Sequence, residues 1–376
     1  METNTFVINI RKATCHVLYA YDIGISTNLA KCLERLEHLG GNAALSNQNR
    51  RAPKYFGYDP QPQTIVLEAQ IPQIGSHSVS SSISLTFYDF GAVSISYEIP
   101  ISGTLDDLRD LSIELGHNGT LLTDSRSRAQ TIVAALGNAV DHPLVATPVE
   151  DYLLFEITDC DMPCPANEIL LHAGPTIAQI LRAEKRELSK QETEDALACH
   201  ISYTPGDITL IDWNAAMVFD TDTSDVRAVL EFANTELLEL RFLDYQLDSS
   251  LDRSYELTRK PHRILQLLPG IAKRNIAIIS QMQLEGAILF ERVSNAPKLL
   301  GDQYLARVYR LAAQRFHVGE WNSSILRKLD TIEDFHKQTN DNAATDRLEL
   351  LEWIVIILIA LEIILPLSSK FIPGIH

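Results

Sequence analysis

The chain has 376 residues, of which 45% are hydrophobic and 22% charged, and its formal net charge is −17 at pH 7. This length allows two or three globular domains, and the composition excludes a disordered tail protein, a collagen and a multi-span transporter. The five irregularly spaced cysteines predict no disulfide framework, and the acidic residues, concentrated in residues 1–250, oppose binding to DNA.

Short apolar and β-branched runs bounded by turn residues predict β-strands through the first 220 residues. The predicted strands are residues 5–10, 15–20, 64–70, 83–88, 93–99, 152–158, 208–212 and 217–219. Helical patterns lie between them, at residues 27–39, 105–115, 126–140, 176–187 and 190–199. This interleaving predicts an α+β fold whose N-terminal mixed α/β region covers residues 1–220, with a possible subdomain break near 141–150.

The hydrophobic period changes at residue 225, after which apolar side chains recur at the spacing of three and four that is typical of helices. The pattern predicts a long helix up to Pro261, a second helix over residues 271–293 and a third over 304–332. The side chains expected to pack in this region are Leu230, Leu237, Leu240, Leu251, Val308, Leu311, Ile325 and Leu329. Residues 225–345 are therefore predicted to form a long helical hairpin or coiled-coil stalk, either as a bundle within one chain or as a coiled coil between the subunits of a homo-oligomer.

The apolar segment at residues 350–369 rises about 30 Å as a helix, which matches the hydrocarbon core of a bilayer. It predicts a single C-terminal transmembrane helix that anchors the chain in membrane lipid, with the bulk of the protein in the cytoplasm and the C-terminal tail outside. The predicted anchor residues are Glu352, Trp353, Ile354, Ile357, Leu361 and Glu362. The alternative is a buried terminal helix of a soluble domain, with its carboxylates pointing outward.

An acidic side chain inside a predicted span is a candidate functional residue. Glu362 could be a neutral carboxyl that hydrogen-bonds to a partner helix, which we favour because no basic residue accompanies it in the span. It could also bind a proton or a cation, which would suit an oligomeric ion channel or transporter whose pore Glu362 faces.

Two sequence motifs resemble a known family. Residues 351–359, LEWIVIILI, are followed by Glu362, and residues 87–93 read FYDFGAV. Together they resemble the Rmd/YagE-like proteins, a domain-of-unknown-function family named after "required for meiotic nuclear division". The resemblance implies a membrane-tethered homo-oligomer without known catalysis, which in mitochondrial members supports translation at the inner membrane. It does not extend to residues 159–219, and the absence of a mitochondrial targeting segment favours a prokaryotic or divergent member.

The best polar candidates for a site are Asp212, Trp213 and Asn214, because no turn or helix cap explains Asp212. No Glu or His at matching spacing accompanies them. A mixed set of cysteines and histidines between Cys160 and His200 lacks the paired spacing of zinc sites, and no phosphate-binding glycine motif occurs. The sequence therefore predicts no catalytic, cofactor or metal site.

These features lead to one functional hypothesis. We expect a membrane-tethered, cytoplasm-facing scaffold or adaptor without catalytic activity. It would hold an unidentified protein or ribonucleoprotein partner near the membrane, since basic side chains on the later helices could contact RNA.

Overall fold

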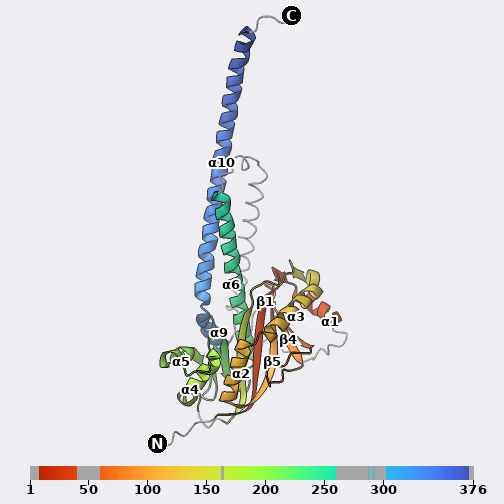
Figure 1. The fold of residues 1–376 in the computed structure, drawn as a ribbon, viewed down its shortest axis with the longest axis vertical. Helices are drawn as coiled ribbons and strands as arrows, with labels where there is room; N and C mark the ends of the chain where they lie inside the picture. The colour runs from red at the N-terminus through yellow and green to blue at the C-terminus, as the bar shows by residue number, and fades with distance from the viewer. Residues whose placement is uncertain are drawn as a thin grey trace. The chain divides into compact units, whose positions relative to one another are not determined.

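The computed structural model describes residues 8–39, 60–161, 165–259, 287, 291 and 302–371 (Figure 1). The chain divides into two compact units. The first contains Met1–Tyr245 and Ala287–Ile325, and the second contains Gln246–Gly286 and Leu326–His376.

One eight-stranded sheet forms the centre of the first unit, in the order β3-β4-β5-β1-β7-β10-β9-β8. Its strands are β1 (Asn9–Asp22), β3 (Gln63–Glu68), β4 (Ser82–Phe87), β5 (Ala92–Thr104), β7 (Glu150–Cys160), β8 (His200–Ile201), β9 (Ile208–Ile211) and β10 (Ala215–Phe219). Neighbouring strands are antiparallel except for β7 and β10, which are parallel. A second, two-stranded sheet pairs β2 (Ser26–Thr27) with β6 (Val140–Asp141). The protein is thus a mixed α/β fold whose large sheet includes strands from both sides of residues 141–150.

Strand β1 combines two predicted strands, residues 5–10 and 15–20, of which residues 5–7 lie outside the described part of the chain. The register with both neighbouring strands shifts between Ile10 and Ala13. The charged pair at positions 11 and 12 interrupts the apolar pattern there, and Arg11 instead pairs with Asp159 and Asp161 beside the strand. A bulge therefore bends the strand without ending it.

From Ala13 onward the odd-numbered side chains of β1, such as Cys15 and Val17, face a continuous hydrophobic core, whereas before the bulge Ile10 faces it and Arg11 is exposed. Helices α1 (Leu29–Leu39), α2 (Leu105–His117), α3 (Thr120–Leu136) and α4 (Ala166–Arg182) contribute to this core, and η1 (Gly137–Ala139) follows α3. Helix α4 begins well before the predicted start at residue 176 and continues through Pro175. The predicted start was therefore wrong, and Pro175 lies in the interior of the helix.

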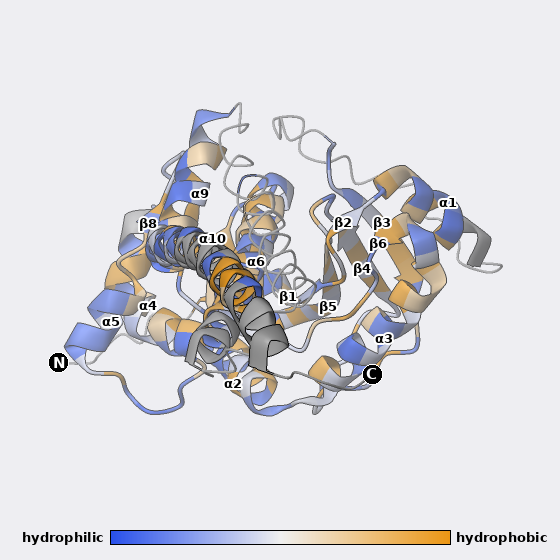
Figure 2. Cartoon of the chain, turned by 90° about the horizontal axis from the view of Figure 1, so that it is seen from above, coloured by the Kyte–Doolittle hydropathy of each residue, from blue (hydrophilic) through white to orange (hydrophobic). Residues whose placement is uncertain are grey.

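The opposite face of the sheet carries polar side chains, including His16, Ser94 and Glu156, yet they are buried. Helix α6 (Ser224–Arg259) supplies contacts to this face, since Arg227 pairs with Glu156 and the ring of Phe232 contacts those of Tyr88 and Phe90. In the view from above, α6 lies between α9 and the strands (Figure 2). Every residue from 229 to 240 is buried, so this part of α6 is an interior helix.

The remaining helices are α5 (Lys190–Ala196), α9 (Gln303–Arg315) and α10 (Val318–Phe371). The third predicted helix is thus two helices, because His317 adopts the left-handed conformation with φ 55° and ends the first. The second predicted helix, residues 271–293, lies outside the described residues except for positions 287 and 291. Of the predicted packing residues, the chain buries Leu230, Leu237, Leu240, Val308 and Ile325 and half-buries Leu251, Leu311 and Leu329.

The predicted transmembrane helix at residues 350–369 is wrong. In the part of the chain that the structure describes, no helix combines the length and the apolar character needed to cross a membrane. Glu352 and Glu362 are exposed and enclose an uncharged stretch, residues 353–361, that rises only about 14 Å, less than half of a bilayer core. The predictions that depend on this span are wrong as well. They are the cytoplasm-facing tail anchor in membrane lipid, the pore faced by Glu362, and the anchor roles of Glu352, Trp353, Ile354, Ile357, Leu361 and Glu362.

The turn between β4 and β5 depends on a glycine. Gly91 has φ 94°, and a Cβ atom there would lie 1.8 Å from the carbonyl oxygen of Gly24. The turn also docks on the segment after β1, because the amide of Ile23 donates to the carbonyl of Gly91 at 2.8 Å. Only a residue without a side chain fits this approach.

We expect Gly91→Ala to lower the free energy of unfolding by more than about 2 kcal/mol, because the methyl group meets backbone that cannot move away. Gly319→Ala is the matched control, since a Cβ atom there has no neighbour within 4 Å and the residue lies in the first turn of α10. Alanine there should change stability by less than about 1 kcal/mol. Urea unfolding followed by circular dichroism measures both, and equal stability of the two variants would contradict the packing described.

Candidate functional site

Asp212 is the centre of an ion-pair network in the first unit. It directly follows β9 and is fully buried. The Nε of Arg182, at the end of α4, lies 2.6 Å from one carboxylate oxygen of Asp212, and the Nε of Arg315, at the end of α9, donates to the other at 2.7 Å. Two arginines from elements far apart in the chain thus meet on one buried carboxylate.

Asp195 of α5 joins the same two arginines. Its Oδ2 accepts hydrogen bonds from Arg182 at 2.6 Å and from Arg315 at 2.7 Å. The hydrogen bonds and charge of Arg315, followed by those of Arg182, lower the pKa of Asp195, and the hydrogen bond from Arg315 to Asp195 helps to raise the pKa of Arg315. Asp212 is thus the acid that is excluded from water, and two arginines pair with it, whereas Asp195 lies about half exposed at the rim with Glu192, which is 3.7 Å from Arg182.

Backbone and aromatic contacts fix Asp212 from the sheet side. The hydroxyl of Tyr152, on β7, donates to the carbonyl oxygen of Asp212 at 2.9 Å. Burial raises the pKa of Tyr152 well above its usual value, so the hydroxyl remains a donor at neutral pH. Phe316, the residue after α9, packs its ring edge-on against Tyr152 at 5.4 Å. The end of α9 is thus attached both by its arginine and by the adjoining aromatic ring.

The three sequence-predicted residues occupy different environments. Asp212 lies inside the network, whereas Trp213 is 53% exposed and stacks under the guanidinium of Arg182 at 5.8 Å. Asn214 is exposed, and its carbonyl oxygen accepts from the amide of Leu153 at 3.0 Å. Trp213 therefore borders the network, and Asn214 contributes only backbone to the sheet.

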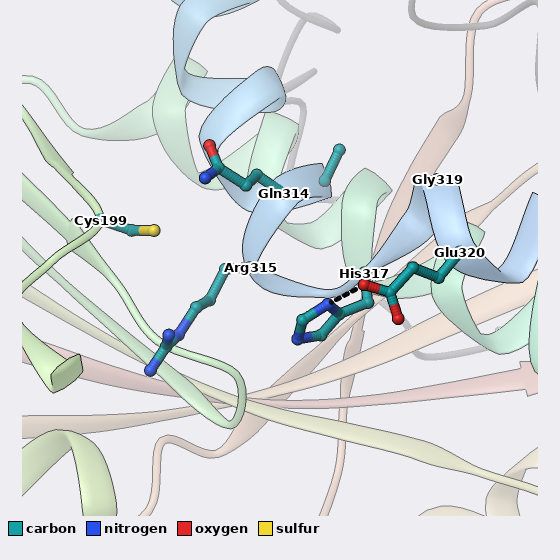
Figure 3. Close-up of a pocket in the computed structure, with 7 residues that line it drawn as sticks. Cys199, Gln314, Arg315, His317, Gly319 and Glu320 are labelled. Carbon is teal, nitrogen blue, oxygen red and sulfur yellow. Dashed lines mark hydrogen bonds and ion pairs between the residues drawn. The ribbon is translucent and has the colours of Figure 1, made fainter. Parts of the chain in front are cut away.

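A pocket of about 460 Å³ opens beside Arg315. It is lined by Cys199, Ala313, Gln314, Arg315, His317, Gly319 and Glu320 (Figure 3). His317 turns toward Glu320, and its Nδ1 lies 3.0 Å from a carboxylate oxygen of that residue. The lining mixes polar and apolar surface, and one wall of the pocket is the turn between α9 and α10.

The chemistry available at this site is limited. Burial raises the pKa of the Cys199 thiol, which makes it a poor nucleophile at neutral pH. The carboxylates of Asp195 and Asp212 are both engaged by arginines. Within the described ranges, no three His, Cys, Asp or Glu residues come close enough to hold a metal ion, and Cys164 of the cysteine and histidine set lies outside them. The arrangement suits holding segments together and binding a small polar group.

Sequence reasoning identified Asp212 but not its partners, Arg182, Asp195 and Arg315. No spacing in the sequence links these positions, because they come from α4, α5 and α9 and meet only in the folded chain. The one available signal was chemical: a buried acid at the end of a strand needs a cation.

The comparisons with known proteins concern mainly the sheet region. The family described as "Uncharacterized protein MJ0711, N-terminal domain" matches residues 12–225, which run from β1 to the start of α6. The uncharacterized protein MJ0711 of Methanocaldococcus jannaschii is 25% identical over 229 residues, covering 59% of this chain and 67% of that protein. No solved structure matches this chain.

We expect Asp212→Asn to lower the free energy of unfolding by about 3–5 kcal/mol, because it removes the negative charge on which two half-enclosed arginines pair. Asn214→Ala is the neighbouring control, since its side chain is exposed, and should change stability by no more than about 0.5 kcal/mol. Urea unfolding followed by tryptophan fluorescence measures both. If Asp212→Asn unfolds at the same urea concentration as the unmodified protein, the network does not hold α9 as described.

Proposed function

This chain belongs to the family of the N-terminal domain of uncharacterized protein MJ0711, and from that premise we propose that it is a homo-oligomeric scaffold that acts by binding rather than by catalysis. The observation that carries the proposal is an uncovered apolar segment of α10, residues 353–361, hereafter the apolar segment.

The apolar segment is exposed on all sides of the helix. Its large side chains range from 44% exposed at Ile354 to 64% exposed at Trp353. These residues are consecutive and make about two and a half helical turns, so no side of the helix is polar there. Monomeric proteins rarely expose apolar patches larger than a few hundred Å², and larger ones mark contact surfaces.

A second copy of the chain is the occupant that we propose for this segment. Eight half-exposed large side chains, at roughly 100 Å² each, offer about 800 Å², which is one partner's share of a standard protein interface. Because the apolar surface surrounds the helix, one neighbouring helix covers only one stripe of it, and association of several copies covers more.

Two further features support a binding role. The acidic and basic groups around Asp212 neutralise one another, which leaves them suited to holding structure. The resemblance of residues 87–93 and 351–362 to the Rmd/YagE-like family belongs to this proposal as well, since it implies homo-oligomers without known catalysis. The partner that such a scaffold would hold is a protein or ribonucleoprotein; DNA is disfavoured by the net charge of −17.

Size-exclusion chromatography with light scattering at micromolar concentration tests the proposal. The unmodified chain should elute at a multiple of 42.0 kDa, and the triple variant Ile354→Ser, Ile357→Ser, Leu361→Ser should shift to 42.0 kDa, because these positions lie on one stripe of α10 and their loss interrupts the apolar surface that a neighbouring helix would cover.

The control is a second triple variant with the same spacing on the same helix: Arg327→Ser, Asp330→Ser, Asp334→Ser. These side chains are exposed and polar, so the oligomer should persist. A monomeric unmodified chain, or an oligomer that survives the apolar substitutions, would refute association through this segment.

A further inference from the structure

Helix α6 follows β1 along its length, and polar groups meet at matching positions. Arg227 lies opposite His16, with Nη1 at 3.0 Å from Nε2, and Glu239 lies where its charge interacts with Asp22. The twelve residues from Arg227 to Glu239 rise about 18 Å along the helix, and the six residues from His16 to Asp22 rise about 20 Å along the strand. The two pairs of residues therefore lie at matching positions. We call the two ends of this interface the Arg227 end and the Glu239 end.

The Arg227 end has ion pairs. His16 lies between two acids, with Glu98 3.9 Å from its Nδ1. Glu231, one turn along α6 from Arg227, is buried, and burial raises the pKa of Glu231 against the hydrogen bond from Ser94 and the charge of Arg227. Glu156 of β7 lies 3.0 Å from Nε2 of His16, and Nη1 of Arg227 donates to both of its carboxylate oxygens at 3.1 and 3.2 Å. Burial acts to raise the pKa of Glu156, but the hydrogen bond and charge of His16, together with the charge of Arg227, outweigh it and lower the pKa. A carboxylate with these partners stays ionised and paired at neutral pH.

The Glu239 end has two acids and no cation. Asp22 is 7% exposed and Glu239 is 1% exposed. Neither carboxylate oxygen of Glu239 has a hydrogen-bond partner, and in the described part of the chain no Lys, Arg or His pairs with either acid. Burial raises the pKa of Asp22 to about 8, against a partial offset from the backbone at Gly24, and burial together with the charge of Asp22 raises the pKa of Glu239 well above its usual value.

The other charged groups near this end are already engaged or acidic. Arg241 of α6 pairs with Glu150 of β7 at 2.7 Å, and Asp151 of β7 adds a negative charge felt by Tyr19 and Tyr21 of β1. Glu236 of α6 accepts a hydrogen bond from Tyr309 of α9, and burial raises the pKa of Glu236 to about 8. The described ionisable groups around the Glu239 end thus supply no uncommitted positive charge.

We propose that α6 is fastened to β1 by ion pairs at the Arg227 end and by protons on Asp22 and Glu239 at the other, so that the Glu239 end is a pH-sensitive latch. Protonated carboxyls are neutral and tolerate burial, whereas two ionised carboxylates repel each other where water cannot solvate them. Loss of the protons therefore releases the Glu239 end of α6, while the Arg227 end remains attached.

The direction of the pH effect follows from linkage. In an opened state both carboxyls ionise near pH 4, but in the closed state they keep their protons to about pH 8 or above. The closed state therefore binds more protons throughout this window. The closed state is most favoured at the acidic limit of this pH window. As the pH rises, the equilibrium constant for opening increases by up to tenfold per pH unit for each proton released.

Hydrogen–deuterium exchange of the full chain between pH 6 and 9, corrected for the intrinsic pH dependence of exchange, tests the latch. Peptides covering residues 17–25 and 234–245 should lose protection as the pH rises, while peptides covering 12–16 and 224–229 should not. Glu239→Gln keeps the shape of the side chain but cannot ionise, so it should reduce this pH dependence, and Asp22→Asn should do so independently; the remainder comes from the other acid of the pair and from Glu236.

Glu34→Gln is the matched control, because Glu34 is exposed on α1, and this variant should behave as the unmodified chain. Protection that does not change with pH, a pH dependence that neither Glu239→Gln nor Asp22→Asn reduces, or loss of protection throughout the chain would each overturn the latch. Protection restored at pH 9 by 1 mM CaCl₂ or MgCl₂ would also overturn it, since the acids would then hold a cation rather than protons.

Discussion

Burial of carboxyl groups along α6 is the constraint on which the rest of the fold depends. A helix placed on a sheet normally turns an apolar stripe toward it, but α6 buries Glu231, Glu236 and Glu239. The sheet face opposite must then supply donors and hydroxyls, such as His16 and Ser94, instead of hydrocarbon. The hydrophobic core is consequently concentrated on the other face, where α1 to α4 pack.

The same arrangement explains where sequence patterns succeeded and failed. Strands β3, β4 and β9 begin and end within two residues of the predicted runs, because alternating apolar residues report the core face correctly. The polar alternates, such as Ser84 and Thr86, would ordinarily indicate a face exposed to water, yet a buried helix packs on that side. Periodicity reports which side of a strand is apolar and says nothing about what covers the polar side.

Two other failures have different physical causes. The sequence pattern predicted one helix where the structure has α9 and α10, because the apolar spacing continues through the break between them. Only the left-handed backbone of His317 marks this break. The predicted span at residues 350–369 rested on apolar side chains that were judged to outweigh Glu352 and Glu362, but these two acids leave only residues 353–361 uncharged between them. The candidate site was foreseen through Asp212 alone, since local sequence does not encode a meeting of arginines from α4 and α9.

The network around Asp212 also crosses the boundary of the family match. Arg182, Asp195 and Asp212 lie within residues 12–225, whereas Arg315 lies outside them. The family region by itself would carry Asp195, Asp212 and the more distant Glu192 against one arginine, and α9 supplies a second positive charge. The sheet region and α9 are thus electrostatically incomplete without each other.

The central position of β1 has a consequence for biosynthesis. The strand precedes every other strand of its sheet in the sequence, but both of its edges must wait for β5 and β7, which are synthesised later. At ordinary translation rates the delay before β7 emerges is on the order of ten seconds. Throughout that interval a strand of 14 residues has two unpaired edges, which are open to pairing with other chains.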